Sequence, residues 1–153
     1  KKIRTIDLSN LKSSTFNELK CKFALKNSTI GIWEFDANLN KVFFSDESKN
    51  IIGFKNKEFG SNPQDWNDRV HPDDKERYFK DFDDHLKGLR PLYTNEHRIL
   101  CKDGAYKWIS DKGKIIERDR EGNPVRIIGT HVDITEHKES ELANSKLVKL
   151  LIL

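Results

Sequence analysis

The chain has 153 residues, of which 35% are hydrophobic and 35% charged, so it has the size and composition of one globular domain with polar connections. Its 28 basic and 25 acidic residues leave a net charge of only +3 and form no basic stripe with interleaved aromatics, which argues against nucleic-acid binding. No run approaches the roughly 20 apolar residues of a membrane span, and no signal-peptide pattern opens the chain, so no direct membrane contact is expected.

Two further features of the composition bear on location. Cys21 and Cys101 lie far apart without the spacing of a metal site, and nothing about them demands an oxidising compartment. The sequence contains no methionine, and hence no initiator. We therefore expect a segment of a longer protein, which is either cytoplasmic or the cytoplasmic part of a membrane-anchored protein.

The N-terminal segment is expected to form a helix that flanks the domain. Residues 1–12 are polar with scattered Ile and Leu, and they predict a tail or linker. Over residues 13–27, Phe16, Leu19 and Phe23 are spaced i, i+3 and i+7, which is typical of an amphipathic helix. The apolar face of this helix could cover the sheet or meet a second copy of the chain.

A hairpin and short helical segments follow. Residues 31–36 and 41–45 predict two strands joined by a tight turn, and residues 46–52 predict a short helix. A loop or short helical turn over 63–70 carries Trp66. This tryptophan is expected in the core, because buried indoles dominate packing area.

The sequence His-Pro-Asp-Asp at 71–74 predicts the start of a longer helix. Proline suits the first helical position, and acidic residues suit the positive end of the helix dipole. Phe79, Phe82, Leu86 and Leu89 then line one helix face. That stripe is interpreted first as core and second as the wall of a pocket.

Three β-runs complete the sheet. They cover about 92–101, 105–118 and 124–134, and the links at 102–104 and 120–123 are rich in turn residues. A last helix then continues through the end of the chain. The predicted fold class is α+β, with one open antiparallel sheet, helices packed on one face, and flanking N- and C-terminal helices.

Several short motifs, in this order and spacing, resemble a PAS domain with its C-terminal PAC segment over roughly residues 24–138. The matching pieces are Gly31 to Asp36, Trp66, Val70 to Asp74, Glu96, Arg98, Lys102 to Gly104, Lys107 to Ile109, Gly129, and Asp133 to Glu136. Each motif is weak alone, since a Lys-Asp-Gly turn is common. Together they resemble the sensory modules of the third PAS-fold type in bacterial or archaeal signalling proteins.

The resemblance implies a PAS fold, a five-stranded antiparallel sheet of order 2-1-5-4-3 with short helices over a cavity. The PAS/PAC domain would span residues 28–135, and residues 136–153 would form a signalling or linker helix. The implied function is that of a regulatory sensor or dimerisation module in a larger signal-transduction protein. The output domain, in the same chain, would belong to a two-component histidine kinase or a cyclic-dinucleotide enzyme. The rival interpretation is a ligand-free structural or protein-interaction spacer that only sets dimer geometry.

Strand alternation and the resemblance together select candidate cavity residues. His97 and Ile99 share one face of their strand. In the flavin-binding LOV branch of the PAS family, positions matching Ile99 and Ile109 hold polar flavin contacts, and the position matching His131 holds a glutamine that contacts the flavin. The candidate lining residues are His97, Ile99, Ile109, His131, Phe79 and Phe82.

The identity of a cofactor is left open by these residues. Two histidines in a pocket could serve an anionic ligand, a haem or a response to pH, or could simply be satisfied by backbone or solvent. The LOV signature Asn-Cys-Arg is absent and apolar Ile99 and Ile109 replace polar flavin contacts, which disfavours flavin. His85 lies near the end of its helix, at the edge of the stripe, which disfavours haem. No cofactor is the leading expectation, and a small organic ligand is the alternative.

No catalytic or metal-binding residue is predicted. The sequence has no Gly-rich phosphate loop, no His-Glu-x-x-His zinc signature and no nucleophile elbow. His131 and Asp133 alternate on a strand, a spacing that can bind a metal but is common by chance. We therefore expect a regulatory module that is not itself an enzyme.

Three further residues of the predicted strands carry structural expectations. Glu96 and Arg98 lie two apart on one strand face, and they are expected to pair with charges on a neighbouring strand. Trp108 is expected in the core for the same reason as Trp66.

Asp133, Ile134 and Thr135 are predicted to join the last strand to the output helix. We expect Thr135 to cap the helix, Asp133 to pin the joint by hydrogen bonds or a basic partner, and Ile134 to pack under the first helix or the sheet edge. His131 lies only two residues before the joint, so a small strand shift could rotate the helix. The alternative is that these residues merely end a strand.

The last helix also suggests self-association. Ala143, Leu147 and Leu150 are spaced as in a heptad seam. Together with the apolar face of the first helix, they predict a homodimer through the flanking helices, weak in this segment because the seam covers barely two turns.

Overall fold

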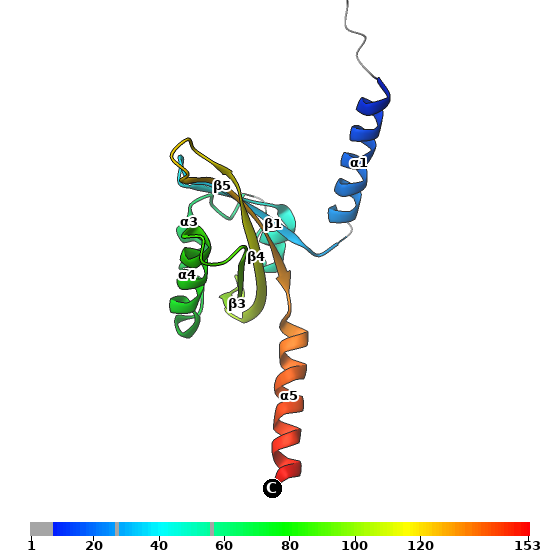
Figure 1. The fold of residues 1–153 in the computed structure, drawn as a ribbon. Coiled ribbons are helices and arrows are strands. Elements are labelled where there is room, and N and C mark those ends of the chain that lie inside the picture. The colour runs from blue at the N-terminus through cyan, green and yellow to red at the C-terminus, as the bar shows by residue number, and fades with distance from the viewer. Residues whose placement is uncertain (1–7, 27, 56) are drawn as a thin grey trace, which may run out of the picture.

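The computed structural model describes residues 8–26, 28–55 and 57–153. Its centre is one five-stranded antiparallel sheet with the strand order β2-β1-β5-β4-β3 (Figure 1). The strands are β1 Gly31–Asp36, β2 Lys41–Phe44, β3 Tyr93–Leu100, β4 Tyr106–Arg118 and β5 Pro124–Asp133. The predicted α+β class and the predicted strand order are both confirmed.

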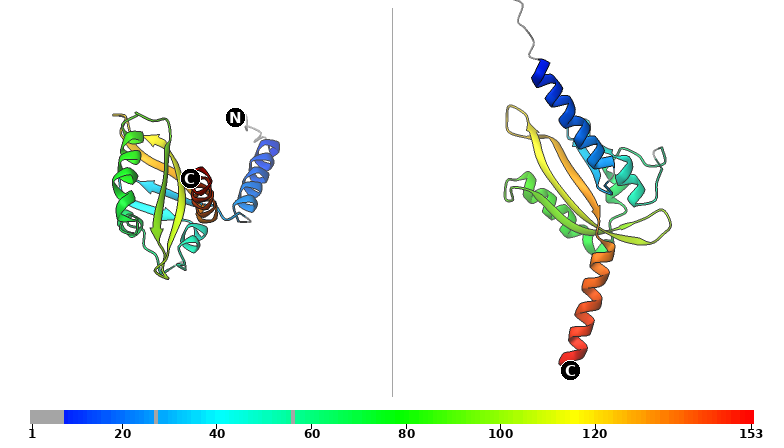
Figure 2. Two further views of the ribbon diagram at one scale, coloured as in Figure 1. Left: turned by 90° about the horizontal axis from the view of Figure 1, so that it is seen from below. Right: turned by 90° about the vertical axis from the view of Figure 1, so that its right-hand side faces the viewer.

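Helices surround this sheet in the described part of the chain. They are α1 Leu8–Lys26, α2 Asp46–Ile51, α3 Pro63–Asn67, α4 Pro72–Leu86 and α5 Thr135–Ile152. Figure 2 shows α4 on one face of the sheet, with α5 and α1 on the other side. None of the described helices is long and apolar enough to cross a membrane.

The turns of the two long hairpins use the chemistry that the sequence indicated. Gly104 and Gly122 both have φ of 87°, in the left-handed region that side chains with a Cβ avoid. In the second turn, the Asp119 carboxylate accepts hydrogen bonds from the backbone N–H groups of Glu121 and Asn123, at 2.9 and 2.8 Å. These local contacts fix where β4 and β5 reverse direction.

The inner face of the sheet carries the core. In β3, the side chains alternate as predicted, with Tyr93, Asn95, His97 and Ile99 buried. Helix α4 begins at the predicted proline, and the preceding His71 caps it by accepting a hydrogen bond from the Asp73 N–H at 3.1 Å. The covered face of the sheet thus lies beneath α3 and α4.

Helices α4 and α1 each differ in one respect from the prediction. Leu89 lies beyond the end of α4 and is 71% exposed, so the buried stripe of this helix is shorter than predicted. The helix predicted over 13–27 begins at Leu8, five residues earlier, while residues 1–7 of the predicted tail and residue 27 lie outside the described part. The side chains predicted to form the apolar face of α1 are 59–72% exposed, and they are Phe16, Leu19 and Phe23.

Trp33 packs directly against two strands that carry glycine at the point of contact. In the register of the sheet, Trp33 lies opposite Gly129 of β5, which lies opposite Gly113 of β4. A Cβ at Gly129 would lie 2.2 Å from the Trp33 ring, and one at Gly113 would lie 2.7 Å from it. The predicted structural role of Gly129 therefore has a specific cause, the close approach of an indole.

Replacing Gly129 by Ala should destabilise the protein by roughly 2 kcal/mol or more, because the indole and the strand backbone leave no room for a methyl group. Urea unfolding measures the loss. The matched control is Thr130→Ala on the adjacent residue, whose cost should stay within the ~1 kcal/mol span of strand propensity. Equal costs for the two variants would contradict the packing argument.

Candidate functional site

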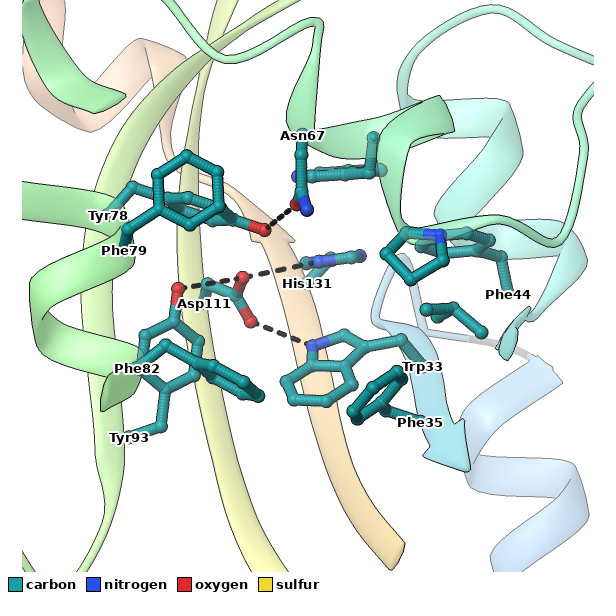
Figure 3. Close-up of a pocket in the computed structure, with 13 residues that line it drawn as sticks. Trp33, Phe35, Phe44, Asn67, Tyr78, Phe79, Phe82, Tyr93, Asp111 and His131 are labelled. Atoms are coloured by element: carbon teal, nitrogen blue, oxygen red, sulfur yellow. Dashed lines mark hydrogen bonds and ion pairs between the residues drawn. The ribbon is translucent and has the colours of Figure 1, made fainter. Parts of the chain in front are cut away.

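A cavity of about 110 Å³ lies between the inner face of the sheet and helices α3 and α4 (Figure 3). Most of its wall is aromatic. The lining residues are Trp33, Phe35, Val42, Phe44, Pro63, Trp66, Asn67, Tyr78, Phe79, Phe82, Tyr93, Asp111 and His131. Phe79 is 49% exposed, so the wall reaches the surface along α4.

A buried carboxylate, Asp111 of β4, faces this aromatic cavity and is only 2% exposed. The Trp33 indole N–H donates to Asp111 Oδ1 at 2.7 Å. The Tyr93 hydroxyl donates to Oδ2 at 3.4 Å, and His131 Nε2 lies 3.5 Å from the same oxygen. One carboxylate oxygen is therefore tightly bound, whereas the other has two long contacts.

The two tyrosines of the cavity are held in the neutral form. Burial raises the pKa of Tyr93 and of Tyr78 well above the ordinary value, and the negative charge of Asp111 raises both further. The Tyr78 hydroxyl donates to Asn67 Oδ1 at 2.8 Å. The phenol groups consequently serve as hydrogen-bond donors at neutral pH.

His131 of β5 forms part of the cavity wall beside Asp111. The two residues are direct cross-strand neighbours, which explains why a polar pair lies on an otherwise apolar face. The imidazole is 2% exposed and stacks on the Trp66 indole with ring centroids 3.9 Å apart and planes 4° apart. Its Nδ1 shares a hydrogen bond with Ser48 Oγ of α2.

The other predicted histidine, His97, belongs to a closed hydrogen-bond chain. The Trp66 indole N–H donates to His97 Nε2 at 3.1 Å, so the ring proton must lie on Nδ1. That N–H donates to Asn95 Oδ1 at 3.0 Å, and the Asn95 amide donates to Asp81 Oδ2 at 2.8 Å. Burial lowers the pKa of His97 from 6.5 to about 4, so the residue is neutral near pH 7.

The six predicted lining residues fall into two groups. His131, Phe79 and Phe82 border the cavity. His97, Ile99 and Ile109 are each fully buried on the inner face, but they pack beside the cavity and do not line it. For His97 the reason is that the Trp66 indole lies against its ring and donates to its Nε2.

His85, weighed above as a haem ligand, is also held by structural contacts. Its Nε2 accepts a hydrogen bond from the Ile115 N–H at 3.1 Å, and its Nδ1 donates to the Arg90 carbonyl at 2.9 Å. The residue does not border the cavity. Within the described residues, no group of three or more His, Cys, Asp or Glu side chains could hold a metal ion.

Sequence reasoning missed Asp111, Tyr93 and Trp33, which make the polar centre of the cavity. A usable signal was present for Asp111. It lies two residues after Ile109, on the same inward face of β4, where strand alternation predicts an apolar side chain. Buried carboxyl groups of this kind need partners, and the partners come from β1, β3 and β5.

A profile of proteins with the PAS fold matches residues 41–131, which is more than half of the chain. The chain belongs to the PAS fold family. Among solved structures, this PAS domain is similar to a sensory box histidine kinase/response regulator from Burkholderia thailandensis, with 24% identity and a TM-score of 0.75, covering 88% of this chain and 99% of that one. It is also similar to the PAS domain of a protein from Colwellia psychrerythraea, with 21% identity and a TM-score of 0.62, covering 79% and 98%.

Two curated proteins are similar in sequence to this PAS domain. The methyl sulfide methyltransferase-associated sensor of Methanosarcina acetivorans is 27% identical over 127 residues, and the two-component sensor PprA of Pseudomonas aeruginosa is 31% identical over 94 residues. The matches cover 83% and 61% of this chain. They span only 12% and 10% of the two relatives, which are therefore far longer than the chain.

The exit of the PAS domain is held by a small hydrogen-bond cluster at the start of α5. The Asp133 Oδ1 accepts from the Thr135 backbone N–H at 3.0 Å and from the Thr135 hydroxyl at 2.6 Å. The Thr135 hydroxyl oxygen in turn accepts from the Trp108 N–H at 3.0 Å, and the Ile134 N–H donates to the Trp108 carbonyl at 2.9 Å. Lys107 Nζ lies 3.8 Å from Asp133 Oδ2.

The joint therefore differs in one respect from its prediction. Thr135 is the first residue of α5 and makes no side-chain cap, because its hydroxyl is engaged by Asp133 and β4. Asp133 instead satisfies the first free N–H of the helix, and it has both the hydrogen bonds and the basic partner expected of it. Ile134, half-buried, is tied to the β4 edge by its backbone.

Two more predictions, both for residues on the outer face of the sheet, are wrong. Trp108 is not a core residue but half-buried, with Arg98 and Lys138 each 5.1 Å from its ring centroid. Glu96 pairs with Lys138 of α5, and Arg98 binds Asp74 of α4 through Nε and Nη2, both at 2.9 Å. These charges join β3 to two helices and not to a neighbouring strand.

The lowered pKa of His97 predicts that the protein is less stable in mild acid. Because its pKa is lowered from 6.5 to about 4 on folding, the unfolded chain binds more protons than the folded one between these values. The free energy of unfolding should therefore fall as the pH drops from 6.5 towards 4, by up to roughly 3 kcal/mol from this residue. Urea unfolding at a series of pH values measures this slope.

A matched pair of variants isolates the contribution of His97. In His97→Gln, an amide oxygen can still accept from Trp66, and the part of the slope due to His97 should vanish. His137→Gln removes an exposed histidine of α5 and should leave the slope in place. A slope that survives unchanged in His97→Gln would show that another group causes it.

Proposed function

We propose that this PAS domain is a regulatory sensor module of a larger signal-transduction protein. Its cavity takes a small ligand, and a change in the sheet passes through the Asp133–Thr135 joint to α5 and to an output domain downstream. The observation that carries this proposal is the position of β5, which has His131 in the cavity wall and Asp133 at the start of α5, two residues apart. The curated relatives, both of them sensors by name, support the same role.

A second route links the cavity to α5. Helix α4 contributes Phe79 and Phe82 to the cavity wall. The same helix holds Arg98 through Asp74, which is 5% exposed. Burial of Asp74 opposes ionisation, but hydrogen bonds and charge from Arg98 together outweigh it, so the pKa of Asp74 is lowered. Arg98 lies over Trp108, and Lys138 of α5 lies over the same ring. A movement of α4 on ligand binding would therefore be felt by α5 through Trp108.

The dimensions of the cavity bear on its ligand. A volume of about 110 Å³ suits a molecule of a few heavy atoms, since a cavity of ~150 Å³ holds benzene. Flavin and haem are far larger, which favours a small organic ligand over either cofactor. In the parent protein, the output would be that of a histidine kinase or a cyclic-dinucleotide enzyme, with this domain on the cytoplasmic side.

The rival function is a ligand-free spacer that only sets the geometry of a dimer. The two functions differ in whether the joint carries a signal. Replacing Asp133 by Ala removes the acceptor at the start of α5 and the partner of Lys107, while the buried core keeps all of its contacts. In the full-length protein, Asp133→Ala should melt within a few degrees of the parent and lose the dependence of its output on the signal.

The control for this test is Glu136→Ala, which removes an exposed carboxylate three residues further along α5 and should leave regulation unchanged. Native mass spectrometry of the freshly purified protein identifies what occupies the cavity. Unchanged melting together with unchanged signal-dependent output in Asp133→Ala would refute the relay and favour the spacer.

We further propose that the module forms a homodimer through its flanking helices. On α5, Leu147 and Leu150 are 56% and 71% exposed, and on α1 Phe23 is 72% exposed. Burial of such side chains between two copies would remove apolar surface from water. No contact with nucleic acid or membrane is part of this proposal.

Dimerisation of this chain should be weak but measurable. Sedimentation equilibrium up to hundreds of micromolar should show an average mass that rises with concentration, and Leu147→Glu should abolish the rise by placing a charge in the seam. The charge-neutral control Ser145→Ala, on an exposed part of the same helix, should behave as the parent. A monomer mass that is independent of concentration would exclude the dimer.

A further inference from the structure

We infer that the cavity binds a compact organic cation, of the size and chemistry of a methylated ammonium group, against the Asp111 carboxylate. This inference rests on the proposed sensory function and adds the chemical class of its ligand. It is carried by three observations on the described residues: the charge of the lining, the use of its hydrogen-bond donors, and the arrangement of its rings.

The charge of the lining favours a cation. Of the thirteen residues that border the cavity, Asp111 carries the only carboxyl group, and none is Lys or Arg. His131 is the only basic residue among them, and it stacks against Trp66 while its Nε2 approaches Asp111 Oδ2 at 3.5 Å. Because Oδ2 has only this contact and a 3.4 Å contact from the Tyr93 hydroxyl, it is the acceptor best placed to attract a positive group.

Three of the hydrogen-bond donors of the wall are already used within the protein. The indole N–H groups of Trp33 and Trp66 donate to Asp111 and His97. The hydroxyl of Tyr78 donates to Asn67. An anion that approached these three donors would have to displace their bonds, and it would be repelled by the nearby Asp111, so the lining disfavours negative ligands.

The rings of the cavity suit a cation that carries methyl groups. Figure 3 shows Phe35, Phe82, Tyr93 and Trp33 grouped near the carboxylate. Phe82 meets Tyr93 at 5.2 Å and Phe35 at 6.5 Å between ring centroids, both edge to face. Ring faces attract cations electrostatically, and apolar ring surface accommodates methyl groups. The apolar rings also lower the local dielectric, which strengthens the attraction of Asp111 for the charge.

The size of the cavity restricts this cation further. About 110 Å³ is less than the ~150 Å³ that holds benzene, so the charged group can carry only a few methyl or methylene groups inside the wall. The half-exposed Phe79 lies where a longer substituent would leave the cavity. A quaternary or tertiary methylammonium headgroup meets both limits when its nitrogen and inner methyl groups lie in the cavity and its outermost methyl group lies at the opening beside Phe79.

The experiment compares three probes of similar shape that differ in charge, using the 153-residue chain. These are tetramethylammonium, neutral tert-butanol and the pivalate anion, each titrated by calorimetry up to about 20 mM, which detects Kd values near 1 mM. Tetramethylammonium should bind about tenfold or more tightly than tert-butanol, and pivalate should not bind. Its methyl proton resonances should shift upfield on binding because they enter a ring-lined site, and the Trp33 indole N–H resonance should also move.

Two variants place the site and one serves as the control. Asp111→Asn keeps the shape and the acceptor for Trp33, and it should weaken tetramethylammonium binding about tenfold or more. Phe82→Leu keeps an apolar side chain but removes a ring, and it should weaken binding several-fold. Phe43→Leu removes an aromatic ring that is 63% exposed on the opposite face of β2 and should leave the affinity unchanged. Thermal unfolding confirms that each variant is folded.

The outcomes separate this inference from the proposed function. Binding of tert-butanol or pivalate as tightly as tetramethylammonium would refute the proposal of a cationic ligand. Full affinity in Asp111→Asn, or a loss of affinity in Phe43→Leu, would refute the proposed site. A neutral or anionic ligand in the cavity would still leave a sensor module. The absence of binding by all three probes also overturns the inference, while loss of signal dependence in Asp133→Ala tests the sensor independently.

Discussion

The buried carboxylate of Asp111 is the constraint around which the inner side of this domain is organised. A carboxylate with 2% exposure must be surrounded by donors, and these come from three other strands: the Trp33 indole, the Tyr93 hydroxyl and the His131 ring. The Trp33 indole reaches Asp111 only because Gly113 and Gly129 leave room for it across two strands. The polar centre of the cavity and the glycine pattern of the sheet are therefore one feature.

The last strand connects this centre to the exit of the domain. β5 carries Gly129, His131 and Asp133 at alternate positions, so one strand contributes the room for Trp33, the partner of Asp111 and the anchor of α5. The proposed relay would use this strand, because the residue that borders the cavity, His131, and the residue that anchors α5, Asp133, lie two positions apart on it.

On the outer face, the Glu-x-Arg motif of β3 ties the sheet to its helices. Arg98 holds the first turn of α4 through Asp74, and Glu96 holds α5 through Lys138. Both cations lie over the Trp108 ring, which is therefore a point where contacts from the two helices meet on the sheet. The partly exposed pair of Glu96 and Lys138 contributes modestly to stability, whereas Asp74 is buried, and the geometry of both pairs defines how α4 and α5 sit relative to each other.

The sequence by itself determined the elements and their order, because these follow from chemistry close along the chain: glycines with positive φ at Gly104 and Gly122, the proline start of α4, and the alternation of β3. It also placed His131, Phe79 and Phe82 on the side that became the cavity. It could not separate them from His97, Ile99 and Ile109, since these three also face the interior and only tertiary packing decides which residues border open space. Asp111 and its donor Trp33 are 78 residues apart, and the partners of Glu96, Arg98 and Trp108 come from α4 and α5. Such contacts exist only once distant segments have been brought together, and so the tertiary structure alone decided the site.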